Sequence, residues 1–180
     1  MPFTATLSSA LAWAVLAHPL GFHAKLTITV SQTKVSVLKV IDVDSGSRCL
    51  LLRESVDANR DGELRGEEVQ NLKKRLVSLA TRPLSLTLSG APLPMQVVDS
   101  KLSLRNDRRV NDSPLSIAVL LEFDDPTALR EGLVLGVTDV APDASSLVLQ
   151  VFQRGETALP AVQEVPSGSL ATFRLRPMKE

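Results

Sequence analysis

Residues 115–123 read Leu-Ser-Ile-Ala-Val-Leu-Leu-Glu-Phe, which is the strongest alternation of side-chain character in the chain. Successive side chains of a β-strand point to opposite faces, so an apolar residue at every second position predicts a strand with one buried face. The buried face of this strand would hold Leu115, Ile117, Val119, Leu121 and Phe123. This stretch predicts a sheet packed against a core.

Weaker runs of the same kind lie on both sides of this stretch. Residues 26–30 and 34–43 predict a hairpin, and further strands are expected at 84–88, 97–104, 133–137, 147–151 and 173–175. Residues 153–170 contain Gly155, Pro160, Pro166 and Gly168 and are expected to form a long loop. Short strands separated by Pro, Gly, Asp and Ser predict a mainly β fold, an antiparallel, Ig-like β-sandwich.

The strand series is interrupted by residues 57–68, which read Asp-Ala-Asn-Arg-Asp-Gly-Glu-Leu-Arg-Gly-Glu-Glu. As a twelve-residue loop, this stretch has side-chain oxygens at positions 1, 3 and 5, glycine at 6, an apolar residue at 8 and glutamate at 12. These positions are Asp57, Asn59, Asp61, Gly62, Leu64 and Glu68. The spacing is that of an EF-hand calcium loop.

The residue types in this loop suit calcium, which takes six to eight oxygen ligands. Asp57, Asn59 and Asp61 would each offer a side-chain oxygen, and Glu63 would offer its backbone carbonyl. Glu68 would bind through both carboxylate oxygens, which favours Ca²⁺ over Mg²⁺. At position 9, Arg65 cannot ligate, so a water would fill that vertex.

Both flanks of the loop predict helices. Apolar residues recur at helical spacing from Cys49 to Val56 and from Val69 to Leu79, so a helix-loop-helix insertion is expected at about residues 47–81. The chain has one such loop, so Leu64 lacks the second hand that usually pairs with position 8. The hand would pair with another molecule or pack on its own domain, and a structural clip is favoured over a sensor.

The affinity of the loop is expected to be low. Arg60 and Arg65 place two cations near three carboxylates that could bind the ion. A dissociation constant on the order of 10⁻⁴ to 10⁻³ M, typical of extracellular modules, is therefore expected.

Composition excludes several classes of protein. The 180 residues are 44% hydrophobic, carry a formal net charge of zero and include 3% aromatic residues. One sizeable domain is expected, and a nucleic-acid partner is not, because such partners reward a basic surface and stacking side chains. No stretch is apolar enough to span a membrane. No histidine lies near an activated serine or cysteine in the sequence, so we expect a binding protein rather than an enzyme; an enzyme with a dispersed active site is the minor alternative.

The N-terminal residues 1–17 predict a secretory signal peptide. Leu7 to Leu16 is a short apolar run, and Val15-Leu16-Ala17 suits signal peptidase, although no Lys or Arg precedes Lys25. A buried N-terminal helix or strand is the alternative. A single domain at 18–180, secreted or periplasmic, is the expected mature form.

The order of these features resembles a known family. Ala17-His18-Pro19-Leu20-Gly21, the hairpin, the single Asp-rich loop and residues 132–139 resemble the extracytoplasmic N-terminal domain of bacterial proteins related to hydrogenase/urease-accessory and nickel/cobalt permeases. The resemblance implies an accessory or binding role with Asp57, Asn59, Asp61 and Glu68 as ligands. It also implies a membrane permease or another extracytoplasmic protein as partner. Transport is not implied, because the permease helices of that family are not in this sequence.

The resemblance leads to a second metal hypothesis. Cleavage after Ala17 would make His18 the N-terminal residue, with His23 nearby. An amine and imidazoles are nitrogen ligands suited to Ni(II) or Cu(II). A metal-handling accessory module is therefore the alternative function, against the simpler interpretation that both histidines are exposed residues near a strand.

Overall fold

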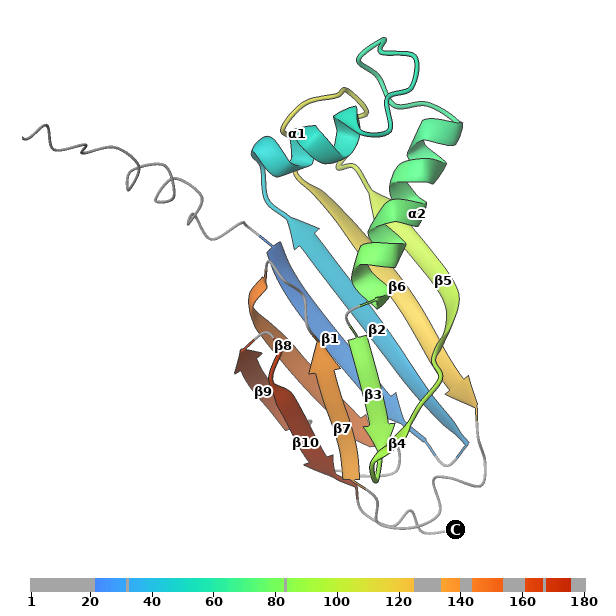
Figure 1. The fold of residues 1–180 in the computed structure, drawn as a ribbon, viewed down its shortest axis with the longest axis vertical. Coiled ribbons are helices and arrows are strands. Elements are labelled where there is room, and N and C mark those ends of the chain that lie inside the picture. The colour runs from blue at the N-terminus through green and yellow to red at the C-terminus, as the bar shows by residue number, and fades with distance from the viewer. Residues whose placement is uncertain are drawn as a thin grey trace, which may run out of the picture.

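The computed structural model describes residues 22–31, 33–82, 84–124, 134–139, 144–153, 161–166 and 168–175. These residues form ten strands and two helices (Figure 1). The strands are β1 (Phe22–Val30), β2 (Lys34–Val43), β3 (Leu84–Leu88), β4 (Ala91–Pro92), β5 (Gln96–Ser103), β6 (Leu115–Asp124), β7 (Val134–Asp139), β8 (Ala144–Gln153), β9 (Ala161–Pro166) and β10 (Leu170–Arg174). The helices are α1 (Ser47–Glu54) and α2 (Glu67–Thr81).

The strands form two sheets, so the predicted mainly β fold is confirmed. The larger sheet has the order β5-β6-β2-β1-β8-β9, and the smaller has the order β10-β7-β3-β4. The alternating strand at 115–123 is β6, and it pairs with β2 from Val43↔Leu115 to Lys34↔Asp124. Leu115, Ile117 and Val119 are fully buried, as the alternation predicts.

One pairing departs from the expected antiparallel arrangement, because β1 and β8 run parallel. The β1–β2 hairpin must be antiparallel because a short turn joins its strands. By contrast, β8 follows β7, which lies in the other sheet, so β8 enters the larger sheet by a crossover. A crossover permits a parallel pair, and no local pattern in the sequence reveals it.

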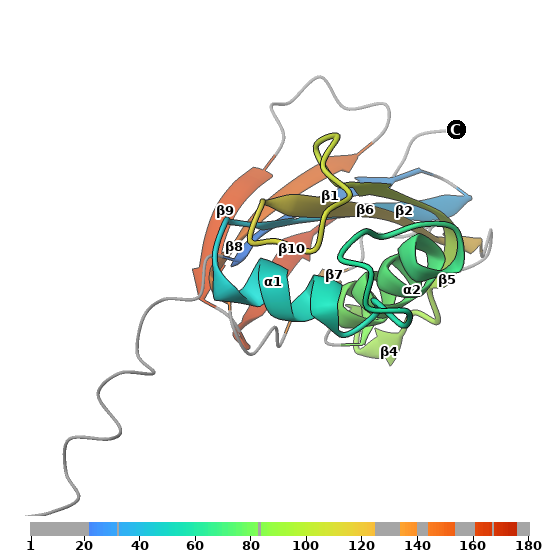
Figure 2. The same cartoon turned by 90° about the horizontal axis from the view of Figure 1, so that it is seen from above.

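The two helices and the smaller sheet lie on the same side of the larger sheet (Figure 2). Helix α2 directs Leu72, Leu76 and Ala80 into the core, where they are buried with the inward side chains of β2 and β6. The helix-loop-helix lies between β2 and β3, as predicted, and its loop projects at one end of the sheet beside the β5–β6 connection (Figure 1).

One strand was not expected. β9 lies within residues 153–170, for which the sequence predicts a loop, and it pairs with β8 at the edge of the larger sheet. Proline is tolerated in an edge strand, because the outer side of that strand has no neighbour that would accept a hydrogen bond from a backbone N–H. Pro166 therefore ends an edge strand rather than excluding one.

The N-terminal predictions fall outside the described residues. The signal peptide at 1–17 and His18 lie there, so both stay predictions. Within the described part of the chain, no helix is long and apolar enough to cross a membrane.

Candidate metal-binding loop

The loop between α1 and α2 contains three residues with positive φ, of which Gly66, at φ 45°, directly precedes α2. Arg60 has φ 57° and Gly62 has φ 78°. Glycine adopts this region without a Cβ clash, which explains its place at the turn of the loop. The chain therefore reverses between Asp57 and Glu68 and brings the two ends of the loop together.

Backbone N–H groups hold the first three predicted ligand side chains. The N–H of Asp61 donates to Asn59 Oδ1 at 2.9 Å, and the N–H of Glu63 donates to Asp61 Oδ1 at 2.8 Å. The N–H of Gly62 donates to Asp57 Oδ2 at 3.2 Å. These bonds fold the side chains back over the loop, although Asn59 and Asp61 stay exposed to solvent.

Glu68 links the two ends of the loop. Its Oε1 accepts from the Ala58 N–H at 3.0 Å, and its Oε2 accepts from the Arg65 N–H at 3.1 Å. The residue is only 8% exposed, although it lies in the first turn of α2. A carboxylate at a helix N-terminus is favoured by the helix dipole. Glu68 thus lies across the loop from Asp57, at the position predicted to close the ligand shell.

The backbone of Glu63 is directed into the loop. Glu63 forms an antiparallel bridge with Arg109, and the bridging hydrogen bonds come from its neighbours: Leu64 N to Arg108 O at 2.7 Å and Val110 N to Gly62 O at 2.8 Å. In such a pair, the N–H and C=O of the central residue both point away from the partner strand. The N–H binds Asp61, so the carbonyl of Glu63 faces the loop, as the ligand prediction requires.

The bridge also identifies what Leu64 packs against. Leu64 is fully buried and its N–H is bound by the β5–β6 connection of the same chain. Of the two arrangements left open by the sequence, packing on its own domain is the one observed.

One carboxylate oxygen of the loop is still able to accept a hydrogen bond or bind a cation. Asp57 Oδ1 is buried and has no hydrogen-bond partner. A buried oxygen without a donor is costly, and a cation would satisfy it. In this arrangement no three His, Cys, Asp or Glu side chains of the described residues are close enough together to hold a metal ion. The loop thus has the donor types and the curl for calcium, while its carboxylates would still have to draw closer around an ion.

The two cations of the loop differ in their surroundings. The Arg65 guanidinium pairs with the Glu63 carboxylate, so the side chain of Glu63 neutralises it while the carbonyl stays available. Arg60 is exposed at the outside of the turn. The charge that opposes calcium is therefore smaller than the sequence alone indicates.

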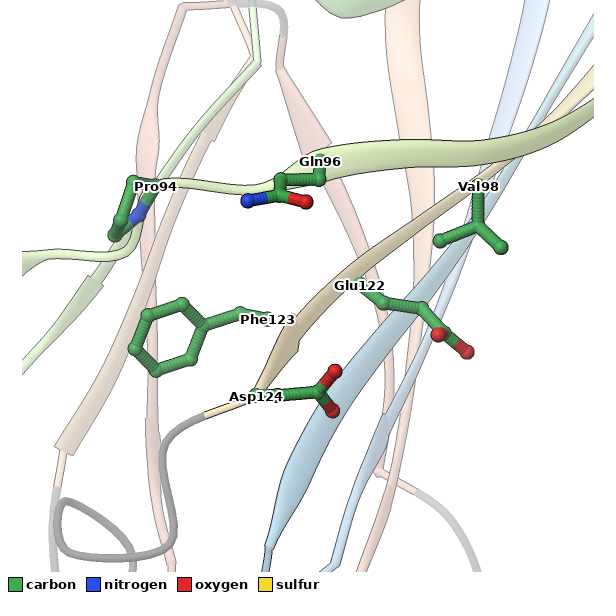
Figure 3. A pocket seen from close by; sticks show the side chains of 6 residues that line it. All are labelled: Pro94, Gln96, Val98, Glu122, Phe123 and Asp124. Atoms are coloured by element: carbon green, nitrogen blue, oxygen red, sulfur yellow. The ribbon is translucent and has the colours of Figure 1, made fainter.

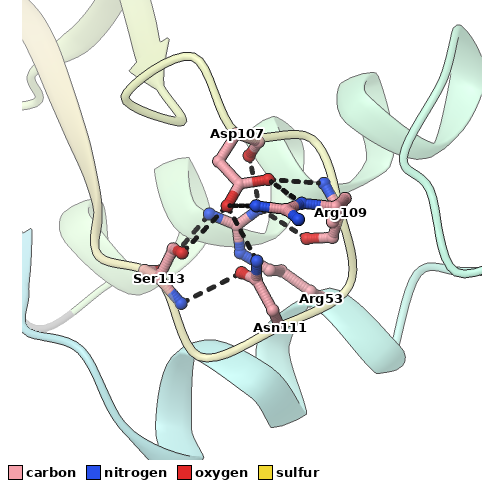
Figure 4. Close-up of polar contacts among 5 residues, drawn as sticks. All are labelled: Arg53, Asp107, Arg109, Asn111 and Ser113. Carbon is pink, nitrogen blue, oxygen red and sulfur yellow. Dashed lines mark hydrogen bonds and ion pairs between the residues drawn. The ribbon is translucent and has the colours of Figure 1, made fainter.

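The β5–β6 connection, residues 104–114, is built around a cation from its own chain (Figure 4). The Arg53 guanidinium donates to the carbonyls of Asp107 at 2.7 Å, Arg109 at 3.0 Å and Ser113 at 3.3 Å. Arg53 is fully buried at the end of α1. Burial lowers the pKa of Arg53, and the Asp107 carboxylate acts in the opposite direction. The guanidinium stays charged, so it fills this loop as a bound ion would.

Asp107 organises the outer side of the same loop. Its carboxylate accepts from Arg109 Nε at 3.1 Å, Asn111 Nδ2 at 2.8 Å and Ser113 Oγ at 3.0 Å. Hydrogen bonds from Arg109 and Asn111 hold the pKa of Asp107 well below its usual range. The basic cluster at 105–109 is therefore a structured turn.

Sequence reasoning did not identify Arg53. Its only signal is its spacing, since it follows the buried Cys49 by four residues on α1 and therefore shares its face. Cys49 itself is a buried thiol whose Sγ contacts the Asp44 carbonyl at 3.2 Å, and burial raises its pKa. This agrees with a structural rather than a nucleophilic thiol.

The hypothesis of a nickel or copper site at His18 and His23 cannot be compared with a described geometry, because only His23 is among the described residues. His23 is exposed, and its Nε2 lies 3.0 Å from Asp44 Oδ2. His18 lies outside the described residues, so its relation to His23 is a prediction only.

A small pocket near the end of β6 offers a different arrangement. It is lined by Pro94, Gln96, Val98, Glu122, Phe123 and Asp124. Figure 3 shows the Phe123 ring on one side and the carboxylates of Glu122 and Asp124 on the other. Lys34 Nζ lies 2.8 Å from Glu122 and 3.7 Å from Asp124, so its single charge offsets part of the negative charge of these two carboxylates.

No protein-family model matches the sequence, and a comparison with curated proteins finds no match.

Proposed function

We propose that residues 57–68 form an EF-hand loop that binds one calcium ion. Asp57, Asn59, Asp61 and Glu68 would supply side-chain oxygens, and Glu63 its carbonyl. The observation that carries this proposal is the set of backbone bonds that hold these oxygens, together with the unpartnered Asp57 Oδ1. The ion's role is to neutralise the carboxylates and to replace the missing donor at that oxygen.

Calcium fits the donor set better than a transition metal. Every candidate ligand of the loop is an oxygen, and hard cations prefer carboxylate, amide and carbonyl oxygens. A glutamate at the last position suits the larger and less rigid coordination of Ca²⁺ rather than the octahedron of Mg²⁺.

The ion would act as a structural clip. The loop is joined to residues 108–110 by the Glu63–Arg109 bridge, and that connection is held by the buried Arg53. Leu64 and the buried side of α2 lie in the same core as the larger sheet. Both sides of the loop are therefore fixed to the domain, which leaves little room for the opening that a sensor needs.

Weak calcium binding suits a compartment with millimolar calcium. A dissociation constant on the order of 10⁻⁴ to 10⁻³ M is typical of extracellular modules. We therefore propose a secreted or periplasmic domain, in line with the signal peptide that the N-terminal apolar run predicts. Its two-sheet arrangement is compatible with the proposed immunoglobulin-like sandwich. A membrane permease or another extracytoplasmic protein remains the predicted partner.

Calorimetric titration of two neighbouring variants tests the proposal. Glu68→Gln removes one charge and one ligand oxygen, and we expect calcium heat to be lost at millimolar concentration. Glu67→Gln removes the same charge at the adjacent exposed position and should leave binding within about threefold, since exposed charges are largely screened. Equal affinities of the two variants, or no heat from the unaltered protein, would refute calcium binding by this loop.

A further inference from the structure

Within the described part of the chain, a buried pair of ionisable side chains lies between the two sheets. Lys39 lies in the middle of β2 in the larger sheet, and Asp139 is the last residue of β7 in the smaller sheet. Lys39 Nζ is 2.6 Å from Asp139 Oδ2, and the side chains are 0% and 1% exposed.

The surroundings of this pair are apolar. Lys39 is flanked across the sheet by Leu26 of β1 and Val119 of β6, and both are fully buried. Val137, two residues before Asp139 on the same strand, is 1% exposed. Among the residues that the structure describes, Asp139 is the charged neighbour of Lys39. The pair therefore lies in a dry part of the core.

The contact lacks the features of a stable buried ion pair. Neither Lys39 Nζ nor either carboxylate oxygen of Asp139 has a hydrogen-bond partner, so the short Nζ–Oδ2 contact does not have hydrogen-bond geometry. A buried ion pair offsets its desolvation only with good geometry and further hydrogen bonds on the remaining protons and lone pairs. Both are missing here, so the contact does not offset the free-energy cost of burying the two side chains.

Burial also favours the reactive form of the lysine. Loss of solvation lowers the pKa of Lys39, and the Asp139 charge only partly opposes this. An uncharged amine is the nucleophilic form of lysine.

From this geometry we infer that Lys39 and Asp139 form an intramolecular amide that links the two sheets covalently. The Lys39 nitrogen attacks Cγ of Asp139, and a Nζ–Cγ bond forms. One Cγ–O bond then breaks, and that oxygen leaves as water with two protons that the Lys39 ammonium gives up as it becomes the amide N–H. No oxidant or co-reactant is needed.

The fixed proximity of the two groups lowers the activation barrier of this reaction. Groups held in contact react with effective molarities of about 10⁵–10⁸ M, which is far above any concentration that a free amine or acid reaches in solution. Exclusion of water from the same site would also slow hydrolysis of the product. The link would join β2 of the larger sheet to β7 of the smaller sheet, which are far apart in sequence.

Mass spectrometry of the full chain gives a direct test. The denatured protein should be lighter than its sequence by one water molecule. Trypsin should leave Lys39 uncut and release residues 35–48 joined to residues 131–154. Without the amide, residues 35–39 are released as a separate peptide and the mass deficit is absent, both in fresh protein and after prolonged incubation. That result would overturn the inference without any variant.

Variants locate the bond. Lys39→Arg and Asp139→Ala each remove one reacting group, so both should show the full sequence mass and no joined peptide. Lys34→Arg changes a partly exposed, ion-paired lysine on the same strand and should retain the deficit. If the joined peptide persists in Lys39→Arg, the link lies elsewhere and the inference is wrong.

Discussion

The loops at 57–68 and 104–114 lie against each other, and both collect oxygen atoms, but they differ in the cation available to them. In the second loop, three backbone carbonyls accept hydrogen bonds from the guanidinium of Arg53. In the first loop, side-chain oxygens are held by backbone N–H groups, and Asp57 Oδ1 is left without a partner. One loop has a cation from its own chain, while the other would take its cation from the medium.

This difference has a consequence for stability. A loop organised by an arginine folds in the same way whatever ions surround the protein. A loop that binds calcium gains stability with the logarithm of the ion's concentration once that concentration exceeds the dissociation constant. Because the Glu63–Arg109 bridge joins the two, the loop at 104–114 provides a fixed edge for the proposed calcium loop at 57–68.

Replacement of Arg53 should have the largest effect. Arg53→Met leaves the carbonyls of residues 107, 109 and 113 without their donor, and we expect the free energy of unfolding to fall by about 3–5 kcal/mol. Urea unfolding with and without calcium measures this. Lys74→Met on the exposed side of α2 is the control and should stay within about 0.5 kcal/mol. A loss that calcium fully restores would contradict the view that Arg53 acts independently of the ion.

Replacement of Asp57 should affect only the calcium-dependent part. Asp57→Asn keeps one oxygen for the Gly62 N–H but removes the charge and the unpartnered oxygen. The unaltered protein should gain about 2.7 kcal/mol at free calcium about 100 times its dissociation constant, and the variant should lose most of this gain. Thermal unfolding in chelator should show no difference between them. A variant that is equally stabilised by calcium would exclude Asp57 as a ligand.

A change at Gly62 separates backbone strain from ion binding. Gly62→Ala places a Cβ at φ 78°, which should cost about 1–2 kcal/mol and weaken calcium binding. Gly90→Ala imposes the same kind of strain at φ 87° in the β3–β4 turn, remote in sequence from the calcium loop. Both variants should lose stability, and only Gly62→Ala should lose calcium affinity. Reduced affinity in both would mean that general destabilisation, rather than the turn of the loop, controls binding.

The smallest effect should be the acid dependence of the second loop. The folded-state pKa of Asp107 lies below its unfolded value, so between these values the unfolded chain binds more protons. The stabilisation from Asp107 is therefore complete above about pH 4 and is lost progressively as the pH falls below that value. Hydrogen exchange at residues 107–113 measures the opening of the loop at decreasing pH. In Asp107→Asn this pH dependence should disappear, and its persistence would assign it to another group.

The sequence predicts local patterns well and long-range contacts poorly. Alternation in β6 and β1–β2, and the helical repeat before and after residues 57–68, predict those elements because each pattern is complete within a few residues. The parallel β1–β8 pair depends on a crossover between sheets, and β9 lies beside proline residues that read as a loop.

Buried charges were the least predictable feature. Lys39 lies at an inward position of β2, in phase with Val37 and Ile41, and this phase is the only local sign of its burial. Its partner Asp139 is distant in sequence, and the carbonyls bound by Arg53 belong to a connection that follows β5. Such partners are defined by the tertiary structure alone.

Residues 57–68 are proposed to bind calcium while fixed to the loop at 104–114 that surrounds Arg53. A titration of the isotope-labelled protein with calcium, followed by amide NMR, tests both parts at once. We expect saturable shifts at millimolar calcium for Asp61, Gly62 and Glu63, with smaller shifts at Arg108 and Val110 across the bridge and none in β9. Absence of shifts in residues 57–68, or equal shifts throughout the larger sheet, would contradict the account.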